Sequence, residues 1–423
     1  MTSPHPPDER AEGAPLSPGA SAHSSDERAE VSRGTSHPKR FENLQAARAT
    51  FGPQVDRVGA MLSRMDPLAD AVVEAFAHMP PGAGMKLLDD ALRSGIGAVS
   101  GAPPELRELF REIDDVPAWV DQRALDRGGE LLYRSGWFGG LVLGLSLLYG
   151  YASPGGNKPL VYSGRLKEQA GRRLAETSRF VQATTAPGGL ERFSPGFAIT
   201  IKVRLVHAQV RRMILASGRW DSATWGAPIN QHDMAGTTLL FSFAPIESLR
   251  ALGFIVEEEE EHLFMQLWRY SGYLMGVRQE ILPTSFLDAA RLKDIIRATE
   301  GIPDDDARRL TAALFAAGPR SKGRTPEERR RSVRQAELGE GLVRAVMGDE
   351  LSDHLGIPKT RYRFAIHPIR AMVSRLERSR LVKRALRTTM IRSGEGYWRL
   401  AVSNAEHAIF AIPTELLGLS SAA

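Results

Sequence analysis

The stretch VRLVHAQVRR, residues 203–212, has apolar residues at helical spacing and one histidine between two arginines. On a helix over residues 197–215, turning about 100° per residue, Arg204 and Arg211 lie about 40° to 60° to one side of His207. Two valines lie as far to its other side. The pattern therefore predicts a helix whose histidine has one cationic flank and one apolar flank.

The same spacing of apolar residues recurs from Phe41 onward, and strand-like alternation is rare. Segments such as MDPLAD, PPGAGM and GIPDDD supply the Pro, Gly and Asp residues that cap and stop helices. The sequence thus predicts an all-α protein, with helices over residues 41–64, 67–79, 84–98, 105–113, 121–150, 161–186, 196–217, 231–243, 257–276, 285–297, 304–317, 326–346, 366–388 and 402–418.

The domain organisation follows from composition along the chain. Residues 1–40 are rich in Pro, Ser, Gly, Ala and charge, which predicts a disordered tail. Residues 41–418 contain no linker-like segment, so we expect one large helical domain there. Within it, WFGGLVLGLSLLYGYA, residues 137–152, is nearly uncharged but shorter than the roughly 20 residues of a membrane span. We expect this segment to be a buried core helix.

Composition also restricts the chemistry. The 423 residues include no cysteine, which excludes disulfides, thiolate ligation of metals and covalent c-type haem attachment. No glycine-rich phosphate-binding motif follows a strand, so nucleotide chemistry is not indicated. The N-terminus lacks the features of a secretory signal, which predicts a cytoplasmic protein.

Basic residues are concentrated in two regions, 319–334 and 359–392, although the net charge is only +5. Aromatic residues do not alternate with them as a base-stacking surface would require, so nucleic-acid binding is not expected. We interpret both regions as a solvated cationic face. Peripheral contact of the basic C-terminal region with an anionic membrane is the alternative.

Two interpretations of His207 follow from the residues. In the first it is a satisfied core histidine, and the arginines extend to water. In the second, the inward arginines need anionic partners, because a buried charge without one costs about 3 to 5 kcal/mol. Haem would supply them, since its iron accepts an imidazole nitrogen and its propionates pair with guanidinium groups. Carboxylates of the chain, such as the run Glu257 to Glu261, would serve instead.

Two further stretches carry candidate functional residues. In RRLAETSRF, residues 172–180, the side chains of Arg173, Glu176, Thr177 and Phe180 share one helix face, which is otherwise typical of ordinary helix surface.

In WGAPINQHDMAGTTLLFSF, residues 225–243, a turn leads into a helix that Asn230, Gln231 or Asp233 would cap. His232 lies at the polar start of this helix, where we expect exposure rather than a metal ligand.

Four motifs resemble, in order and spacing, the oxygenase family of the bacterial rubber oxygenases, which also includes a membrane-bound oxygenase of the mycophenolic acid pathway. They are RxxxT at Arg173 and Thr177, VRLVHAQVR at 203–211, WGAPINQHDMAGT at 225–237 and LWRYSGYLMGV at 267–277. The resemblance implies an all-helical, globin-reminiscent fold that holds non-covalent haem b.

The resemblance also implies roles for individual residues. His207 falls on the proximal iron ligand, Arg204 and Arg211 on its flanking arginines, and Arg173 and Thr177 on the distal helix.

This sequence departs from the family at two places. A rubber oxygenase has lysine before the distal threonine, where this chain has Glu176. It also has a catalytic glutamate upstream, where this chain has Asn157 and Lys158; Glu168 and Glu176 are the substitutes within reach in sequence.

The resemblance thus implies a haem b-dependent oxygenase that uses dioxygen on an apolar, unsaturated, isoprenoid-like substrate and cleaves a carbon–carbon double bond. Rubber oxygenases are typically secreted, so we do not expect high-polymer rubber as the substrate of this chain. One alternative is a haem-binding sensor or carrier without turnover. Another is a haem-free helical protein that docks on a membrane or partner through its basic C-terminal region.

Overall fold

The computed structural model describes residues 37–162, 170–317, 325–382 and 384–403, and every regular element in them is a helix. The all-α prediction is confirmed. The elements are α2 (Leu44–Phe51), α3 (Gln54–Ala60), η1 (Met61–Ser63), α4 (Pro67–Ala77), α5 (Ala83–Ser94), η2 (Ile96–Ala98), α6 (Pro104–Asp114), α7 (Gln122–Gly128), α8 (Glu130–Arg134), α9 (Phe138–Tyr151), α10 (Pro154–Tyr162), α11 (Ala170–Thr185), α12 (Pro195–Ala216), α13 (Ser222–Trp225), α14 (Gln231–Phe241), α15 (Phe243–Ala251), α16 (Glu258–Leu274), α17 (Phe286–Thr299), α18 (Asp305–Ala316), α19 (Pro326–Met347), α20 (Asp349–His354), η4 (Arg361–Ala365), α21 (Ile366–Val382) and α22 (Arg384–Ser403).

Helix starts follow the capping residues in the sequence. The side chain of Asp66 accepts a hydrogen bond from the Ala69 amide and starts α4, with proline in the first turn. Ser194 starts α12 in the same way. Thr325 and Glu328 form a reciprocal capping box at the start of α19. Local chemistry therefore fixes where these helices begin.

Several predicted helices are shorter than the sequence pattern suggested. Residues 121–150 form α7, α8 and α9 instead of one helix. The break at Gly129 coincides with a close crossing, because a Cβ there would lie 1.9 Å from the carbonyl oxygen of Thr185. Residues 41–64 likewise form α2, α3 and η1 instead of one helix. The break between α2 and α3 follows Gly52, whose φ is +67°.

At the C-terminus the prediction and the structure also differ. Residues 366–388 were predicted as one helix, but α21 ends at Val382 and α22 continues to Ser403. Of the predicted helix 402–418, residues 404–418 lie outside the described part, as do residues 1–36 of the predicted tail.

Residues 37–40, which we assigned to the tail, belong to the folded unit that begins at His37. The amides of Lys39 and Arg40 donate to the carbonyl oxygens of Ala223 and Thr224, and the Arg40 side chain is buried. The tail boundary was therefore placed a few residues too late.

The apolar segment at 137–152 forms α9, and its buried side chains contribute to two apolar clusters, as expected of a core helix. No single helix in the described ranges is long and apolar enough to cross a membrane. The stretches Gln122–Arg134 and Phe138–Tyr151 would pass such a test only together, and they meet at a bend of 100°.

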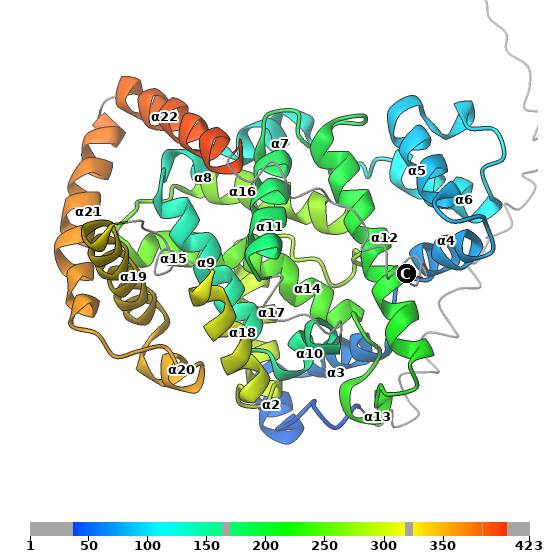
Figure 1. Cartoon of the computed structure of the whole chain (residues 1–423), viewed down its shortest axis with the longest axis horizontal. Helices are drawn as coiled ribbons and strands as arrows, with labels where there is room; N and C mark the ends of the chain where they lie inside the picture. Colours follow the sequence, from blue (N-terminus) through cyan, green and yellow to red (C-terminus); the bar gives the residue numbers. More distant parts are fainter. Residues whose placement is uncertain (1–36, 163–169, 318–324, 383, 404–423) are drawn as a thin grey trace, which may run out of the picture. The chain divides into compact units, whose positions relative to one another are not determined.

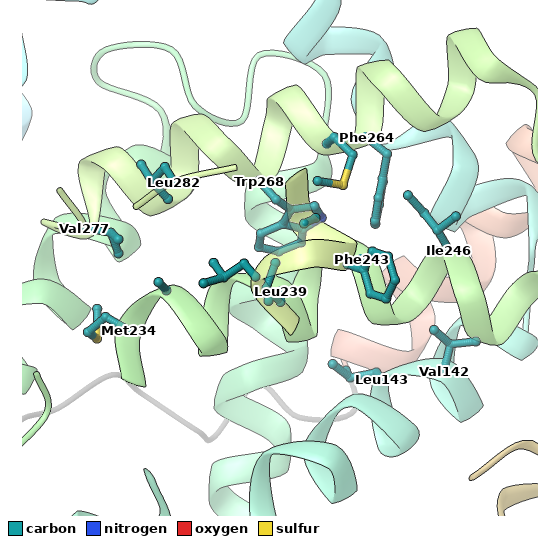
Figure 2. Packing of buried hydrophobic residues seen from close by; sticks show 14 of the residues in the cluster. Val142, Leu143, Met234, Leu239, Phe243, Ile246, Phe264, Trp268, Val277 and Leu282 are labelled. Carbon is teal, nitrogen blue, oxygen red and sulfur yellow. The ribbon is translucent and has the colours of Figure 1, made fainter. Parts of the chain in front are cut away.

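The largest apolar cluster brings α9, α14, α15 and α16 together. Figure 2 shows Trp268 and Phe264 of α16 gathered with Leu239 and Phe243, across from Val142 of α9. A second cluster joins α4, α5 and α6 to α12 and α16. Helix α12 thus has one face in this second cluster and packs against α11 with another (Figure 1).

The packing of α22 against α8 leads to a testable prediction at two glycines. A Cβ at Gly394 would lie 1.6 Å from the carbonyl oxygen of Tyr133, whereas a Cβ at Gly396 meets nothing within 4 Å. Gly394→Ala is expected to lower the free energy of unfolding by about 1–3 kcal/mol through overpacking. Gly396→Ala should leave it unchanged or raise it by up to about 1 kcal/mol. Urea denaturation compares the two, and equal effects would contradict this packing.

Candidate functional site

Helix α12 positions His207 in its middle. The face with Phe197, Ile201, Leu205 and Ala208 is buried in the second apolar cluster. Because residues at positions i, i+4 and i+7 or i+8 share a helix face, His207 does not belong to that row. It lies on a different, half-buried part of the helix surface.

The imidazole of His207 is sheltered by its surroundings. Its Nδ1 is buried and has no hydrogen-bond partner among the described residues. Burial, with a smaller contribution from nearby Arg211, lowers the pKa of His207 to about 4. The ring is therefore neutral near pH 7, which is the form that ligates metal ions.

This pKa predicts a pH dependence of stability. The unfolded chain, with a His207 pKa near 6.5, binds the proton more readily than the folded chain, so stability falls as the pH drops from 6.5 towards 4. Between pH 7 and pH 5, His207 should account for a loss of about 2 kcal/mol in the free energy of unfolding. Urea denaturation at several pH values should show this component in the unmodified chain and not in His207→Gln. An identical pH slope in both chains would contradict it.

Arg204 is already paired with carboxylates of the chain. Its Nε donates to Asp66 Oδ2 at 2.6 Å, and Nη2 donates to Asp66 Oδ1 at 3.0 Å and to Glu112 Oε1 at 2.9 Å. Burial lowers the pKa of Arg204, but Asp66 and Glu112 outweigh burial and raise it. Gly276 closes over this group, because a Cβ there would lie 2.3 Å from Asp66 Oδ2.

Arg211 has a similar environment two turns further along. Its Nε donates to Asp70 Oδ1 at 2.7 Å, and Nη1 donates to the carbonyl oxygen of Ile229 at 3.3 Å. Burial raises the pKa of Asp70, and Arg211 opposes that rise. Asp66 caps α4 and Asp70 lies in its first turn, so the start of this helix supplies a partner for each arginine.

The arginine pairs correct one expectation. The carboxylates beside Arg204 and Arg211 come from α4 and α6, not from residues 257–261. Three glutamates of that run instead bind other arginines, namely Glu259 to Arg127, Glu260 to Arg134 and Glu261 to Arg250.

The charge of the two arginines therefore does not by itself require a cofactor. Each guanidinium still keeps one buried nitrogen without a partner in the described part of the chain, Nη1 of Arg204 and Nη2 of Arg211.

Helix α11 carries the other predicted site residues. Arg173, Glu176 and Thr177 are all half-buried, and Phe180 is buried in the core. Glu176 Oε1 accepts from Nε of Arg172 at 2.9 Å, in an i,i+4 pair on the helix surface. No hydrogen bond between described residues joins these side chains to His207.

The end of α11 approaches α12 closely. A Cβ at Gly196 would lie 2.4 Å from the carbonyl oxygen of Ala183, so only glycine fits at this crossing. The fold thus places the helix of Arg173 and Thr177 next to the helix of His207 (Figure 1).

The segment at 225–237 has a structural role. Asn230 caps α14 by accepting from the Asp233 amide at 2.9 Å, as one of the predicted alternatives. Gln231 Nε2 donates to the carbonyl oxygens of Met65 and Gly276 at 3.1 and 2.9 Å. These bonds link α14 to the loops before α4 and after α16.

His232 is buried, so the expectation that it is exposed was wrong. The N-terminal segment covers it. The Phe41 ring packs edge-on against the His232 ring, with the two ring centroids 6.1 Å apart, and Arg40 binds the neighbouring Asp233. Burial raises the pKa of Asp233, but Arg40 and His232 outweigh burial and hold it at about 2. Burial also raises the pKa of nearby Glu300.

Sequence reasoning missed Asp66, Asp70 and Arg40 as parts of these buried groups. Asp66 and Asp70 had been noted only within the helix boundary MDPLAD. Their four-residue spacing was a usable signal for two carboxylates on one helix face.

The described carboxylates and histidines do not form a cluster that would bind a metal ion directly. In the described ranges, no three or more His, Asp or Glu side chains come together to hold a bare metal ion.

In the basic C-terminal region, Lys359 pairs with Asp353, Arg363 with Asp349 and Arg387 with Glu130. Those cations are partly neutralised within the chain, and membrane contact through this region stays a prediction.

Comparison with known proteins agrees with the motifs. Residues 131–378, more than half of the chain, match the family described as ER-bound oxygenase mpaB/B'/Rubber oxygenase, catalytic domain. The chain belongs to this oxygenase family. The matched range contains α11, α12 and the segment at 225–237, so the predicted site residues lie within the catalytic domain.

Two relatives extend the comparison. The rubber oxygenase of Streptomyces sp. strain K30 is 26% identical over 349 residues, which covers 78% of each chain. The solved structure of latex clearing protein in the closed state matches with a TM-score of 0.60 at 22% identity. That match covers 79% of this chain and 88% of the other and shows a shared fold. This member of the oxygenase family is therefore an oxidoreductase with the helical fold of latex clearing protein.

Proposed function

We propose that this oxygenase binds haem b, with His207 as the protein ligand of the iron. The observation that carries the proposal is the half-buried His207 side chain, whose Nδ1 atom is buried without a partner among the described residues and whose lowered pKa keeps the ring neutral near pH 7. The absence of cysteine is compatible with non-covalent haem, which needs no thioether links. When bound, the haem would supply an iron centre that activates dioxygen.

The arginines beside His207 have a second role in this proposal. Arg204 and Arg211 would each direct their remaining free nitrogen, Nη1 and Nη2 respectively, at a propionate. Their existing pairs with Asp66 and Asp70 fix both guanidinium groups relative to α4. The imidazole of His207 is then held on a helix whose position is set by buried ion pairs.

On the opposite side, Arg173 and Thr177 of α11 would shape the distal pocket. Both side chains are half-buried, and their helix packs against α12. Glu176 would be available to accept a proton from the substrate only after it leaves its pair with Arg172. We propose Glu176 as the acid–base residue. Because its carboxylate is paired with Arg172 in this structure, we expect that contact to break in the working enzyme.

The proposed substrate is an apolar, unsaturated, isoprenoid-like molecule whose double bond is cleaved to two carbonyl groups by addition of one dioxygen. A relative that carries the name rubber oxygenase supports this class.

The test uses full-length protein supplied with haem, an oxygen electrode and derivatisation of carbonyl products. Addition of squalene should cause oxygen uptake by the enzyme and formation of carbonyl compounds. Addition of squalane, its saturated counterpart, should cause neither. Haem binding without oxygen uptake on squalene or shorter unsaturated isoprenoids would contradict the proposal and favour a sensor or carrier.

A further inference from the structure

Gln231, the first residue of α14, is buried and uses both polar atoms of its side chain. Its Nε2 donates to the carbonyl oxygens of Met65 and Gly276 at 3.1 and 2.9 Å. Its Oε1 accepts from the Arg278 amide at 2.9 Å, and its own amide donates to the carbonyl oxygen of Arg64 at 2.9 Å. One residue therefore joins two backbone segments that are far apart in sequence, one before α4 and one after α16.

Both segments are next to the buried ion pair of Arg204 and Asp66. Asp66 directly follows Met65 in the chain. Gly276 lies over the pair, because a Cβ there would be 2.3 Å from Asp66 Oδ2 and 2.6 Å from Arg204 Nε. The width of the gap that holds the guanidinium therefore depends on the hydrogen bonds of Gln231.

The turn before Gln231 contacts the other arginine. Ile229 has a φ of +50°, a left-handed backbone conformation that is unfavourable for a β-branched residue. Its carbonyl oxygen accepts from Arg211 Nη1 at 3.3 Å. Strained backbone of this kind persists only where surrounding contacts hold it, and it is concentrated at functional sites. Residues 229–231 thus reach both arginines that flank His207, one directly and one through the segments that Gln231 joins.

We propose that Gln231 is a positioning residue that fixes the orientation of the Arg204 guanidinium beside His207. Carboxylates occupy Nε and Nη2 of Arg204, and Nη1 has no partner among the described residues. Because the guanidinium is planar and rigid, fixing Nε and Nη2 also fixes the direction of Nη1. The use of Nη1 for a haem propionate rests on the proposed function, whereas the orientation of Arg204 by Gln231 does not.

Solvent exchange of arginine Nε protons separates this role from a general contribution to stability. If Gln231 only stabilised the domain, its loss would increase opening everywhere, whereas a positioning role predicts increased opening at Arg204 alone. Arg134 provides the reference, because its side chain is fully buried and its Nε donates to Glu260 at 2.8 Å. Neither Arg134 nor Glu260 belongs to the segments that Gln231 joins.

The main variant is Gln231→Met, which keeps the length of the side chain and removes its hydrogen bonds. Exchange with water is measured by NMR on isotope-labelled full-length protein, and each Nε–H signal is assigned by its loss in Arg204→Lys or Arg134→Lys. In Gln231→Met, exchange at Arg204 should become about 10-fold faster, as expected for the loss of buried hydrogen bonds. Exchange at Arg134 should stay unchanged.

Gln231→Asn is the milder second variant. It keeps the amide but shortens its reach by one methylene group, so exchange at Arg204 should become about 3-fold faster. It carries the test if Gln231→Met does not fold.

Gly394→Ala is the reciprocal control. A Cβ at Gly394 would press on the carbonyl oxygen of Tyr133, which directly precedes Arg134 in the chain. This variant should speed exchange at Arg134 and leave exchange at Arg204 unchanged.

Haem titration of the same proteins, followed by absorption, tests the use of Arg204 Nη1. Gln231→Met should bind haem about 5- to 10-fold more weakly than the unmodified protein, because a misdirected Nη1 loses one charge-assisted hydrogen bond. Gly394→Ala should bind haem with unchanged affinity.

Three results would overturn the proposal: unchanged exchange at Arg204 in the Gln231 variants, equal acceleration at Arg204 and Arg134, or unchanged haem affinity in Gln231→Met. Failure of the proposed function looks different, because the unmodified protein would then bind no haem. Faster exchange confined to Arg204 would in that case still assign its orientation to Gln231.

Discussion

Replacing Arg204 by alanine is expected to lower the free energy of unfolding by about 3–5 kcal/mol, because it leaves a buried carboxylate without its partner. The Arg204 side chain is 3% exposed and Asp66 is 8% exposed, so water cannot replace the guanidinium. Asp66 would keep only its hydrogen bond from the Ala69 amide. The loss should appear in urea denaturation as a lower midpoint.

The matched control for Arg204 is on the same helix. Arg212 binds Glu74 at 2.8 Å, but both side chains are exposed, 44% and 57% respectively. Arg212→Ala should therefore cost less than about 1 kcal/mol. Similar losses in the two variants would show that burial of the Arg204 ion pair does not increase its contribution to the free energy of unfolding. Arg204→Lys, which keeps the charge but not the two-pronged geometry, should fall between them.

Arg134→Ala is expected to have an effect of similar size, about 3–5 kcal/mol. The Arg134 side chain is fully buried and binds Glu260 at 2.8 Å and Glu377 at 2.7 Å. These two glutamates come from α16 and α21, so removal of the arginine leaves two buried carboxylates where three segments meet. Thermal or urea denaturation should show the loss.

Arg127→Ala controls for the Arg134 variant. Arg127 is on the neighbouring helix α7 and binds Glu259 at 2.7 Å, with both side chains exposed. Its removal should change the free energy of unfolding by less than about 1 kcal/mol. If Arg134→Ala had an equally small effect, the ion pairs of Arg134 with Glu260 and Glu377 would not hold α21 to the rest of the domain.

The helices were predictable because their signals are local. Apolar spacing gave the all-α class, and the boundaries MDPLAD and GIPDDD supplied Asp66 and Asp304, which cap α4 and α18. The breaks were not predictable in the same way. The break after α7, at Gly129, depends on a close backbone crossing with Thr185, which is far along the chain and cannot be recognised from the local pattern.

The site shows the same division between local and distant causes. The projection of one helix was sufficient to single out His207 and to place arginines on one flank. Their partners Asp66 and Asp70 are 138 and 141 residues away in sequence, so helical spacing could not pair them. The burial of His232 was missed for the same reason, since Phe41 and Arg40 cover it from the start of the domain.

These contacts also change the reason for assigning a cofactor. The two arginines were expected to need an anionic ligand, but α4 and α6 already supply carboxylates to them. The remaining support from this structure is the neutral, unpaired imidazole of His207 and the free guanidinium nitrogens beside it. The histidine, rather than the charge, is therefore the decisive feature to test.

The absorption spectrum of the full-length protein, purified after expression with added haem precursor and recorded oxidised and dithionite-reduced, tests the central claim most directly. We predict a Soret band with stoichiometric haem in the unmodified protein, loss of that band in His207→Ala, and its retention in His262→Ala, which replaces an exposed histidine on α16. An unmodified protein without a Soret band, or a His207→Ala variant that keeps a full one, would contradict the account.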